Sequence, residues 1–162
     1  MASRGEPKVG DRAPEFTLES STGSRISLAD FRGRSEVVLF FYPKANTPFC
    51  TAEACTFRAN EESFRKVGAQ VIGISSASPE ALARFASLRK LPFLLLSDPD
   101  GEVRRKYGVS RTFGFLPGRV TYLIDREGII RHIYSSQFQP TRHAVEMLGV
   151  LRDLHGERSP EA

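Results

Sequence analysis

The chain contains little sulfur: two cysteines and two methionines among 162 residues. A chain of this length can bury a hydrophobic core without cross-links. Two cysteines also fall far below the density of a secreted disulfide scaffold. The fold therefore does not need the cysteines as disulfide cross-links, and a pair of this kind is more often catalytic or metal-binding.

Long apolar runs are also missing. The opening MASRGEPKVGDRAPEF contains no apolar run that would serve as a signal peptide. No stretch of the sequence approaches the roughly 20 apolar residues of a membrane span. We therefore expect a soluble, cytoplasmic protein from a reducing compartment, with no membrane partner.

Charge of one sign is not concentrated anywhere. The formal net charge is +4, and the densest basic cluster, residues 104–106, is followed at once by Tyr107 and Gly108. Such a distribution is typical of a solvated mixed-charge surface, so we expect no nucleic-acid partner. Internal repeats are absent as well, which predicts a single domain over residues 1–162 with an ordered core at about 8–156.

Strand-like and helix-like patterns alternate along the chain. Strands are expected at residues 16–18, 25–27, 37–42, 71–74, 93–96, 120–124 and 129–134. Helices are expected at residues 48–67, from Ser78 onward, at 102–107 and at 141–155. This order predicts an α/β fold of the thioredoxin-like type, with a central mixed sheet flanked by helices and an N-terminal β-hairpin extension.

Apolar spacing in two of these helices predicts which side chains face the core. The expected inward residues are Leu82, Phe85 and Leu88 in one helix and Val145, Leu148, Leu151 and Leu154 in the last helix.

Both cysteines lie in the segment FYPKANTPFCTAEACTFR, directly behind an apolar strand. Pro48 suits the first helical position and Thr47 suits the N-cap, so Cys50 should lie in the first turn of a helix. Free amides and the helix dipole there stabilise a thiolate. Cys55 lies more than one turn deeper, which makes Cys50 the better nucleophile.

The spacing of five residues keeps the two thiols apart. On an ideal helix such positions are rotated by about 140° and their Cα atoms lie roughly 8 to 9 Å apart, whereas a disulfide tolerates about 4.4 to 6.8 Å. A bond between them would require the first turns to unwind. On the residues alone two alternatives stay open: a pair of buried, inert cysteines, and a zinc site. Zinc is disfavoured because His132, His143 and His155 show no ligand spacing with the cysteines.

The segment PKANTPFC, residues 43–50, resembles the active site of the peroxiredoxins, whose motif is Pro, three residues, Thr or Ser, two residues, Cys. FYPKANTP followed by CTAEAC is similar to the Q-type subgroup, also called bacterioferritin comigratory proteins. VGDRAPEFTL, DFRG, LPFLLLSDPDGEV and RVTYLID resemble family segments in family order, so the resemblance covers nearly the whole chain. Phe49 departs from the subgroup pattern, because the subgroup usually has Gly at this position. A bulky ring there would either narrow the peroxide entrance or change how readily the first turn unwinds.

The resemblance implies that Cys50, as a thiolate, attacks the terminal oxygen of a hydroperoxide. It places the Thr47 hydroxyl near the sulfur and the peroxide, and the Arg119 guanidinium beside the sulfur. Pro43 and Phe49 complete the expected substrate-binding residues. Glu53 is either a member of an active-site hydrogen-bond network or an exposed helix carboxylate.

The resemblance further implies that Cys55 is the resolving thiol, which forms an intramolecular disulfide with Cys50. Thioredoxin or a similar dithiol protein would then reduce that disulfide. The expected protein is thus a monomeric, thioredoxin-dependent peroxidase that reduces hydrogen peroxide and organic hydroperoxides in antioxidant defence, with no metal or other cofactor.

Three other functions compete with this one. Cys55 could be buried packing in a one-cysteine peroxidase that uses an external thiol. A thiol-disulfide oxidoreductase is disfavoured because the chain lacks Cys-x-x-Cys. A redox-sensing or holdase protein would react once with peroxide, exposing Phe49 and Phe57 as the helix unwinds.

Overall fold

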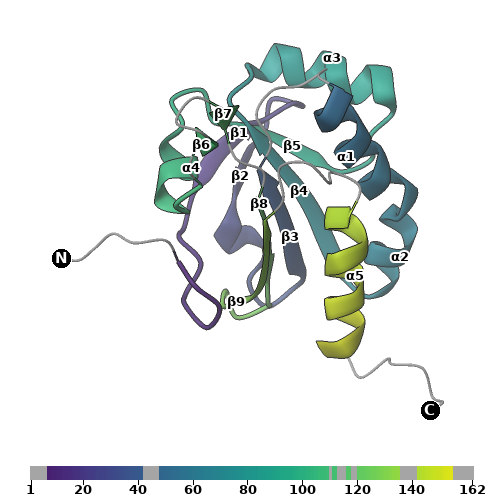
Figure 1. Ribbon diagram of the computed structural model, residues 1–162. Coiled ribbons are helices and arrows are strands. Elements are labelled where there is room, and N and C mark those ends of the chain that lie inside the picture. The colour runs from purple at the N-terminus through teal and green to yellow at the C-terminus, as the bar shows by residue number, and fades with distance from the viewer. Residues whose placement is uncertain are drawn as a thin grey trace.

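The computed structural model describes residues 7–41, 48–109, 111–112, 116–117, 120–135 and 142–154. In this part of the chain seven strands form one mixed sheet, in the order β2-β1-β5-β4-β3-β8-β9 (Figure 1). Their bounds are β1 Thr17–Ser20, β2 Arg25–Ser27, β3 Glu36–Phe41, β4 Ala69–Ser75, β5 Leu94–Ser97, β8 Val120–Ile124 and β9 Ile130–Ser135. Two short strands, β6 Arg111–Thr112 and β7 Leu116–Pro117, pair separately.

The sheet is parallel at its centre and antiparallel toward both edges. Strand β3 runs parallel to β4, and β4 runs parallel to β5. Strand β8 is antiparallel to β3, and β9 is antiparallel to β8. On the other side, β1 joins β5 antiparallel and β2 pairs with β1. The predicted mixed sheet and N-terminal hairpin extension are therefore confirmed.

Helices cover the two faces of the sheet unequally. Their bounds are α1 Pro48–Ala59, α2 Glu61–Lys66, α3 Pro79–Arg89, α4 Glu102–Lys106 and α5 Arg142–Leu154, with a 3₁₀ turn, η1, at Leu28–Phe31. Helices α1, α2, α3 and α5 bury their apolar residues in one core cluster. Helix α4, η1 and the residues before β1 contribute to a second cluster on the opposite face. The predicted thioredoxin-like layering is thus present (Figure 1).

Strand β3 is buried on both faces, as its continuous apolar run predicts. Val38 and Phe40 belong to the cluster under α1 and α5. Val37, Leu39 and Phe41 belong to the other cluster. Because successive side chains of a strand alternate between faces, this one strand links both cores and fixes where the chain leaves the sheet after Phe41.

The helix expected at residues 48–67 is interrupted, and this part of the prediction is wrong. Helix α1 ends at Ala59, and α2 begins at Glu61. Asn60 lies between them with φ −106° and ψ 9°, and its side-chain amide donates to the carbonyl of Thr56 at 2.8 Å. An asparagine that bonds its own preceding turn ends a helix readily. Gly68, with φ +82°, follows α2 as expected.

Three residues expected to face inward are exposed instead: Leu88 (64%), Val145 (62%) and Leu154 (48%). Each step of three residues falls about 60° short of a full helical turn, so a long series at that spacing drifts off the buried face. The buried residues of α5 are His143, Ala144, Met147, Leu148 and Leu151. Leu82, Phe85, Leu148 and Leu151 are buried as predicted.

Candidate active site

The helix that carries both cysteines begins at the predicted residue. Pro48 is the first residue of α1, so the backbone of Cys50 lies in the first turn. Phe49 and Glu53 belong to the same helix. Pro43, Thr47 and Arg119 lie outside the described residues. The structure therefore places the two cysteines on one helix and leaves the expected roles of the other site residues as predictions.

Cys55 lies on the second half of α1 as a half-buried free thiol. Its neighbour Ala54 is 1% exposed, and Phe57 is fully buried. Because both cysteines lie in one α-helix, their Cα atoms are separated by roughly 8 to 9 Å, beyond the span of a disulfide. A bond between the two cysteines would therefore require part of this helix to open.

The second half of α1 is anchored to its neighbours. The Phe57 ring stacks on Phe40 of β3 with centroids 4.5 Å apart, and it meets the edge of Phe93 at 6.5 Å. The Arg58 guanidinium donates to the carbonyl of Arg89, the last residue of α3. These contacts hold Cys55 in place on a helix segment that packs against both the sheet and α3.

The register of the sheet brings two chain segments to one edge of the molecule. Phe41, the last residue of β3, is paired with Val120, the first residue of β8. The chain leaves β3 there toward α1, and Arg119 immediately precedes Val120 in the sequence. The segments that carry Cys50 and Arg119 therefore join the sheet at neighbouring positions of one edge.

A buried polar pair lies next to this edge, and the sequence analysis did not single it out. Thr121 of β8 and His143 of α5 are both fully buried, and Thr121 Oγ1 and His143 Nδ1 share a hydrogen bond of 2.7 Å. Tyr134 of β9 meets the His143 ring edge-on, with centroids 4.8 Å apart. Only the position of His143, inside the apolar pattern of a helix, could have signalled it.

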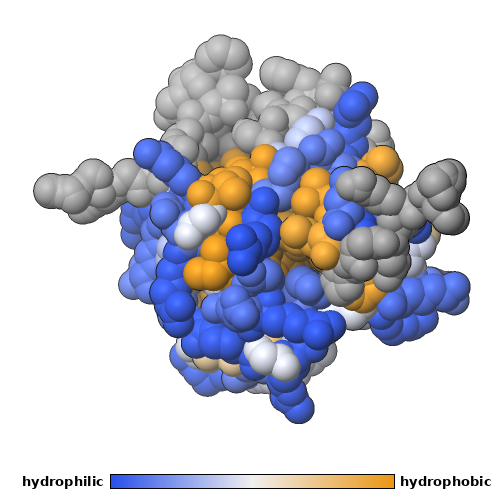
Figure 2. Space-filling model, turned by 90° about the horizontal axis from the view of Figure 1, so that it is seen from below, coloured by the Kyte–Doolittle hydropathy of each residue, from blue (hydrophilic) through white to orange (hydrophobic). Residues whose placement is uncertain are grey.

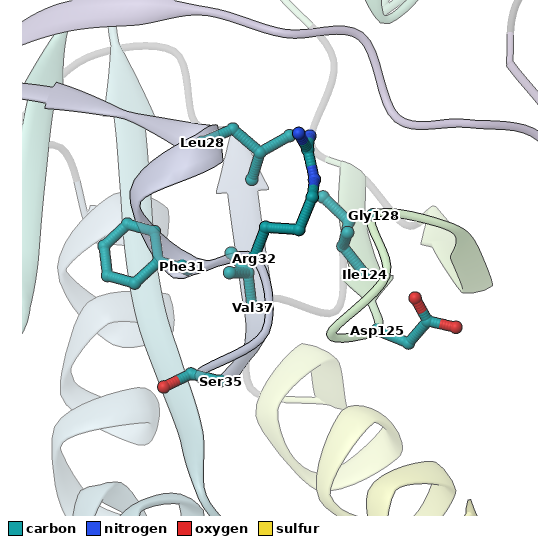
Figure 3. A pocket seen from close by; sticks show the side chains of 8 residues that line it. All are labelled: Leu28, Phe31, Arg32, Ser35, Val37, Ile124, Asp125 and Gly128. Carbon is teal, nitrogen blue, oxygen red and sulfur yellow. The ribbon is translucent and has the colours of Figure 1, made fainter.

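A pocket lies at the opposite end of the sheet, where β3 begins and β8 ends (Figure 3). Val37, the second residue of β3, and Ile124, the last of β8, contribute to its lining. Arg32 is ion-paired with Glu15, and the Asp125 carboxylate turns away from the pocket and accepts from Arg131 Nε at 2.6 Å. Figure 2 looks onto this end and shows apolar side chains bordered by hydrophilic ones. The lining contains no cysteine, so this pocket is separate from the thiol chemistry.

Two groups outside the thiol helix have shifted pKa values. Burial raises the pKa of Tyr107 well above its ordinary value, and nearby Tyr122 adds to the effect. Burial alone would raise the pKa of Asp125, but hydrogen bonds from the Ile129 amide, the Arg131 side chain and the Glu127 amide outweigh it, so the pKa is lowered. Both groups serve structure, in the core and in the β8–β9 turn respectively.

Metal-binding clusters and membrane-spanning helices are both absent from the described residues. Among them, no group of three or more His, Cys, Asp or Glu side chains is arranged to hold a metal ion. No helix in the same part of the chain is long and apolar enough to cross a membrane.

A thioredoxin-like sheet with a cysteine in the first turn of the helix after its central strand defines a class of thiol proteins. Comparison with known proteins narrows this class. The model of the AhpC/TSA family matches residues 9–133. Peroxiredoxin Q of Oryza sativa subsp. japonica is 46% identical over 151 residues, covering 93% of this chain and 69% of the relative. Peroxiredoxin Q of Sedum lineare is 47% identical over 146 residues, covering 90% and 78%.

Solved structures agree with these relatives. The peroxidoxin BcpB of Mycobacterium tuberculosis superposes with a TM-score of 0.86 at 38% identity, covering 92% of this chain and 99% of its own. Xanthomonas campestris peroxiredoxin Q gives a TM-score of 0.81 at 26% identity, covering 93% and 98%. The chain therefore belongs to the AhpC/TSA family and, within it, to the peroxiredoxin Q group.

Membership defines the general activity. The chain is a thiol-dependent peroxidase, an antioxidant oxidoreductase that acts on a peroxide and takes electrons from a thiol reductant. The plant relatives are named as chloroplastic proteins, so the cytoplasmic location expected from the sequence is not confirmed by them.

Proposed function

We propose that Cys50 is the peroxidatic residue of this peroxidase. Its thiolate attacks the terminal oxygen of a hydroperoxide; the S–O bond forms as the O–O bond breaks, and the departing oxygen takes a proton to leave as water or an alcohol. Cys50 becomes a sulfenic acid. The observation that carries this proposal is the start of α1 at Pro48, since first-turn amides and the helix dipole favour an anionic sulfur at Cys50.

The proposed substrate site completes this chemistry with residues from two segments. The Thr47 hydroxyl orients the peroxide and the sulfur, and the Arg119 guanidinium stabilises charge on the leaving oxygen. Pro43 shields the thiolate from water, and Phe49 borders the entrance. The pairing of Phe41 with Val120 supports this assembly, because both segments reach the sheet at the same edge.

Glu53 keeps its two possible roles. A carboxylate on the first half of α1 can either accept hydrogen bonds within the active site or remain a solvent-facing helix residue. Glu53→Gln separates them: a role in the site lowers the rate constant of Cys50 oxidation, whereas an exposed side chain leaves it unchanged.

Cys55 is proposed as the resolving residue. Its thiol sulfur attacks the Cys50 sulfenic sulfur; the S–S bond forms, and the sulfenic oxygen leaves as water with the thiol proton. Half-burial leaves the Cys55 thiol reachable. Because Ala54 and Phe57 are held in the core, the unwinding that joins the sulfurs falls on residues 48–53, so Cys50 moves toward Cys55.

Thioredoxin or a similar dithiol protein is the proposed reductant. Its two thiols donate two electrons and two protons, which returns both cysteines to the free form. We further propose that the chain acts as one domain and as a monomer, in the cytoplasm, without a metal or cofactor and without a nucleic-acid partner. The scattered basic residues and the small number of cysteines support these points.

The decisive experiment compares Cys55→Ser with Cys50→Ser. The chain has no third cysteine, so each variant retains one defined thiol. We expect Cys50→Ser to lose peroxide reduction altogether. Cys55→Ser should still react once with peroxide but should stop turning over with thioredoxin. Full steady-state activity of Cys55→Ser would show a one-cysteine peroxidase and contradict the resolving role.

A redox sensor or holdase would differ in turnover rather than in its first reaction. The burial of Phe57 counts against a holdase that works by exposing this ring, because opening residues 48–53 leaves Phe57 packed on Phe40. Steady-state consumption of peroxide with thioredoxin present separates the two functions. An enzyme consumes many equivalents, whereas a sensor stops after one.

A further inference from the structure

The pair formed by His143 and Thr121 lies beside the active-site edge, and the proposed mechanism does not use it. Both side chains are fully buried, and the hydrogen bond between them measures 2.7 Å. His143 is the second residue of α5, and Thr121 is the second residue of β8. The bond therefore joins the beginning of a helix to the beginning of a strand.

The sheet register places this bond on the same face of the sheet as the helix that carries the cysteines. Phe40, Thr121 and Tyr134 are directly paired across β3, β8 and β9, so their side chains share one face. Phe40 packs on Phe57 of α1, and both Thr121 and Tyr134 contact His143 of α5. Helices α1 and α5 pack against each other over this face (Figure 1). Phe40, Thr121 and Tyr134 therefore form one surface of the sheet on which both helices pack.

We propose that His143 is a positioning residue for the peroxidase reaction, which acts through Thr121 to fix the start of β8. Arg119 lies two residues before Thr121, so a shift of this strand end moves the guanidinium relative to the Cys50 sulfur. The proposal rests on the proposed roles of Cys50 and Arg119. In this proposal His143 does not touch the reacting atoms and affects them only through strand β8.

A hydrogen bond suits this task better than apolar packing. Apolar contacts are non-directional, so by themselves they do not specify one orientation of a helix on a sheet. A buried hydrogen bond loses strength steeply when its length or angle changes, and breaking it leaves polar groups unsatisfied. The bond at 2.7 Å therefore sets the rotation of α5 and the position of the β8 start together.

The test removes each end of the bond and then restores it with a smaller polar group. His143→Leu and Thr121→Val remove the bond, whereas His143→Asn and Thr121→Ser keep a polar atom near the same place. We expect the first two variants to slow the oxidation of Cys50 by hydrogen peroxide about tenfold. A misplacement of about 1 Å costs up to about a hundredfold in rate, and the shift expected here is smaller. The polar variants should recover most of the rate. The apparent pKa of Cys50, from the pH dependence of the rate, should rise only in the first two.

Tyr122→Phe is the matched control. Tyr122 follows Thr121 on β8, belongs to the opposite core cluster and donates a hydrogen bond of 2.8 Å to the Tyr107 carbonyl. This variant also removes a buried bond from β8, but on the other face. We expect lower stability with an unchanged apparent Cys50 pKa. If Tyr122→Phe shifts that pKa as much as Thr121→Val does, general loosening of β8 explains the effect and the proposal is wrong.

Combination with Arg119→Met separates this inference from the proposed function. If His143 acts through Arg119, His143→Leu should cause little further loss once Arg119 is replaced. An Arg119→Met variant with full activity would contradict the proposed site itself. A slow Arg119→Met variant beside a His143→Leu variant of normal rate and normal Cys50 pKa would overturn only the positioning role.

Discussion

Phe49 is the residue at which this chain departs from the peroxiredoxin Q pattern expected from its sequence. It lies between Pro48 and Cys50 in the first turn of α1. We propose that a ring at this position borders the path to the sulfur and adds an apolar group that must move when the turn opens. Both effects are local to one side chain, so a single substitution tests them.

Replacement of Phe49 by Gly should change substrate preference. If the ring narrows the entrance, a bulky organic hydroperoxide should gain more in rate than hydrogen peroxide when the ring is removed. Stopped-flow oxidation of Cys50 by each peroxide measures the two rate constants. Phe57→Leu serves as a control for ring removal elsewhere on α1. Equal gains for both peroxides would show that Phe49 affects unwinding or the thiolate instead of access.

The carboxylate of Asp125 makes the stability of the fold depend on pH. Its oxygens accept from the amides of Glu127 and Ile129, each at 2.9 Å, and from Arg131 Nε at 2.6 Å. These bonds outweigh burial and lower its pKa in the folded state. The stabilisation from these bonds is fully present above the unfolded-state pKa of about 3.9. It is lost as the pH falls through the lower pKa of the folded state.

Asp125→Asn should therefore be less stable than the native chain at neutral pH. The difference should shrink as the pH falls below about 4, because the native carboxyl then becomes protonated. Thermal unfolding across this range measures it, with the exposed Asp100→Asn as the control. A stability difference that stayed constant down to strongly acidic pH would show that the Asp125 charge is not involved.

The second half of helix α1 is attached to neighbouring elements. Phe57 and Arg58 fasten the second half to β3 and α3. Asn60 closes its end by a bond to Thr56, so α1 is separated from α2. The proposed disulfide between the two cysteines can therefore form by opening the first half of α1 while the second half stays folded.

Hydrogen exchange on the reduced and disulfide forms tests this division. In an α-helix each amide donates to the carbonyl four residues earlier, so we expect the amides of residues 52–56, whose acceptors lie at 48–52, to lose protection in the disulfide form. The amides of residues 58 and 59, whose acceptors lie at 54 and 55, should keep it. Amides of β4 provide an internal reference, because that strand lies in the sheet between β3 and β5. Loss of protection through residue 59 would mean that the whole helix opens and that the Phe57 contacts do not limit it.

The elements themselves were largely predictable from local chemistry. Apolar runs located β3, β4 and β8, and the sequence Ser78, Pro79 predicted the start of α3, where the Ser78 hydroxyl accepts from the Ala81 amide at 3.1 Å. The inward residues were less predictable, because a spacing of three residues drifts around a helix and only packing decides where the buried face ends. Leu88 and Val145 are exposed for this reason.

In the molecule as a whole, the residues alone predicted the candidate site only where its members lie close together in the sequence, and Arg119 was expected from the resemblance. The spacing of Cys50 and Cys55 is visible in one segment and sets the geometry of the thiol pair. The contact between Thr121 and His143 joins residues 22 positions apart, and it depends on the pairing of β8 with β3 and the packing of α5. No local pattern encodes such a contact, because it results from the closure of the complete sheet.

We propose that peroxide converts Cys50 and Cys55 into one intramolecular disulfide. The most direct measurement treats the reduced native protein with one equivalent of hydrogen peroxide, then determines its mass and free thiols under non-reducing conditions. We predict a monomer with no free thiol and a mass lower by about 2 Da, the two hydrogens lost on disulfide formation. A monomer that retains one free thiol and gains oxygen, or a covalent dimer, would contradict the claim.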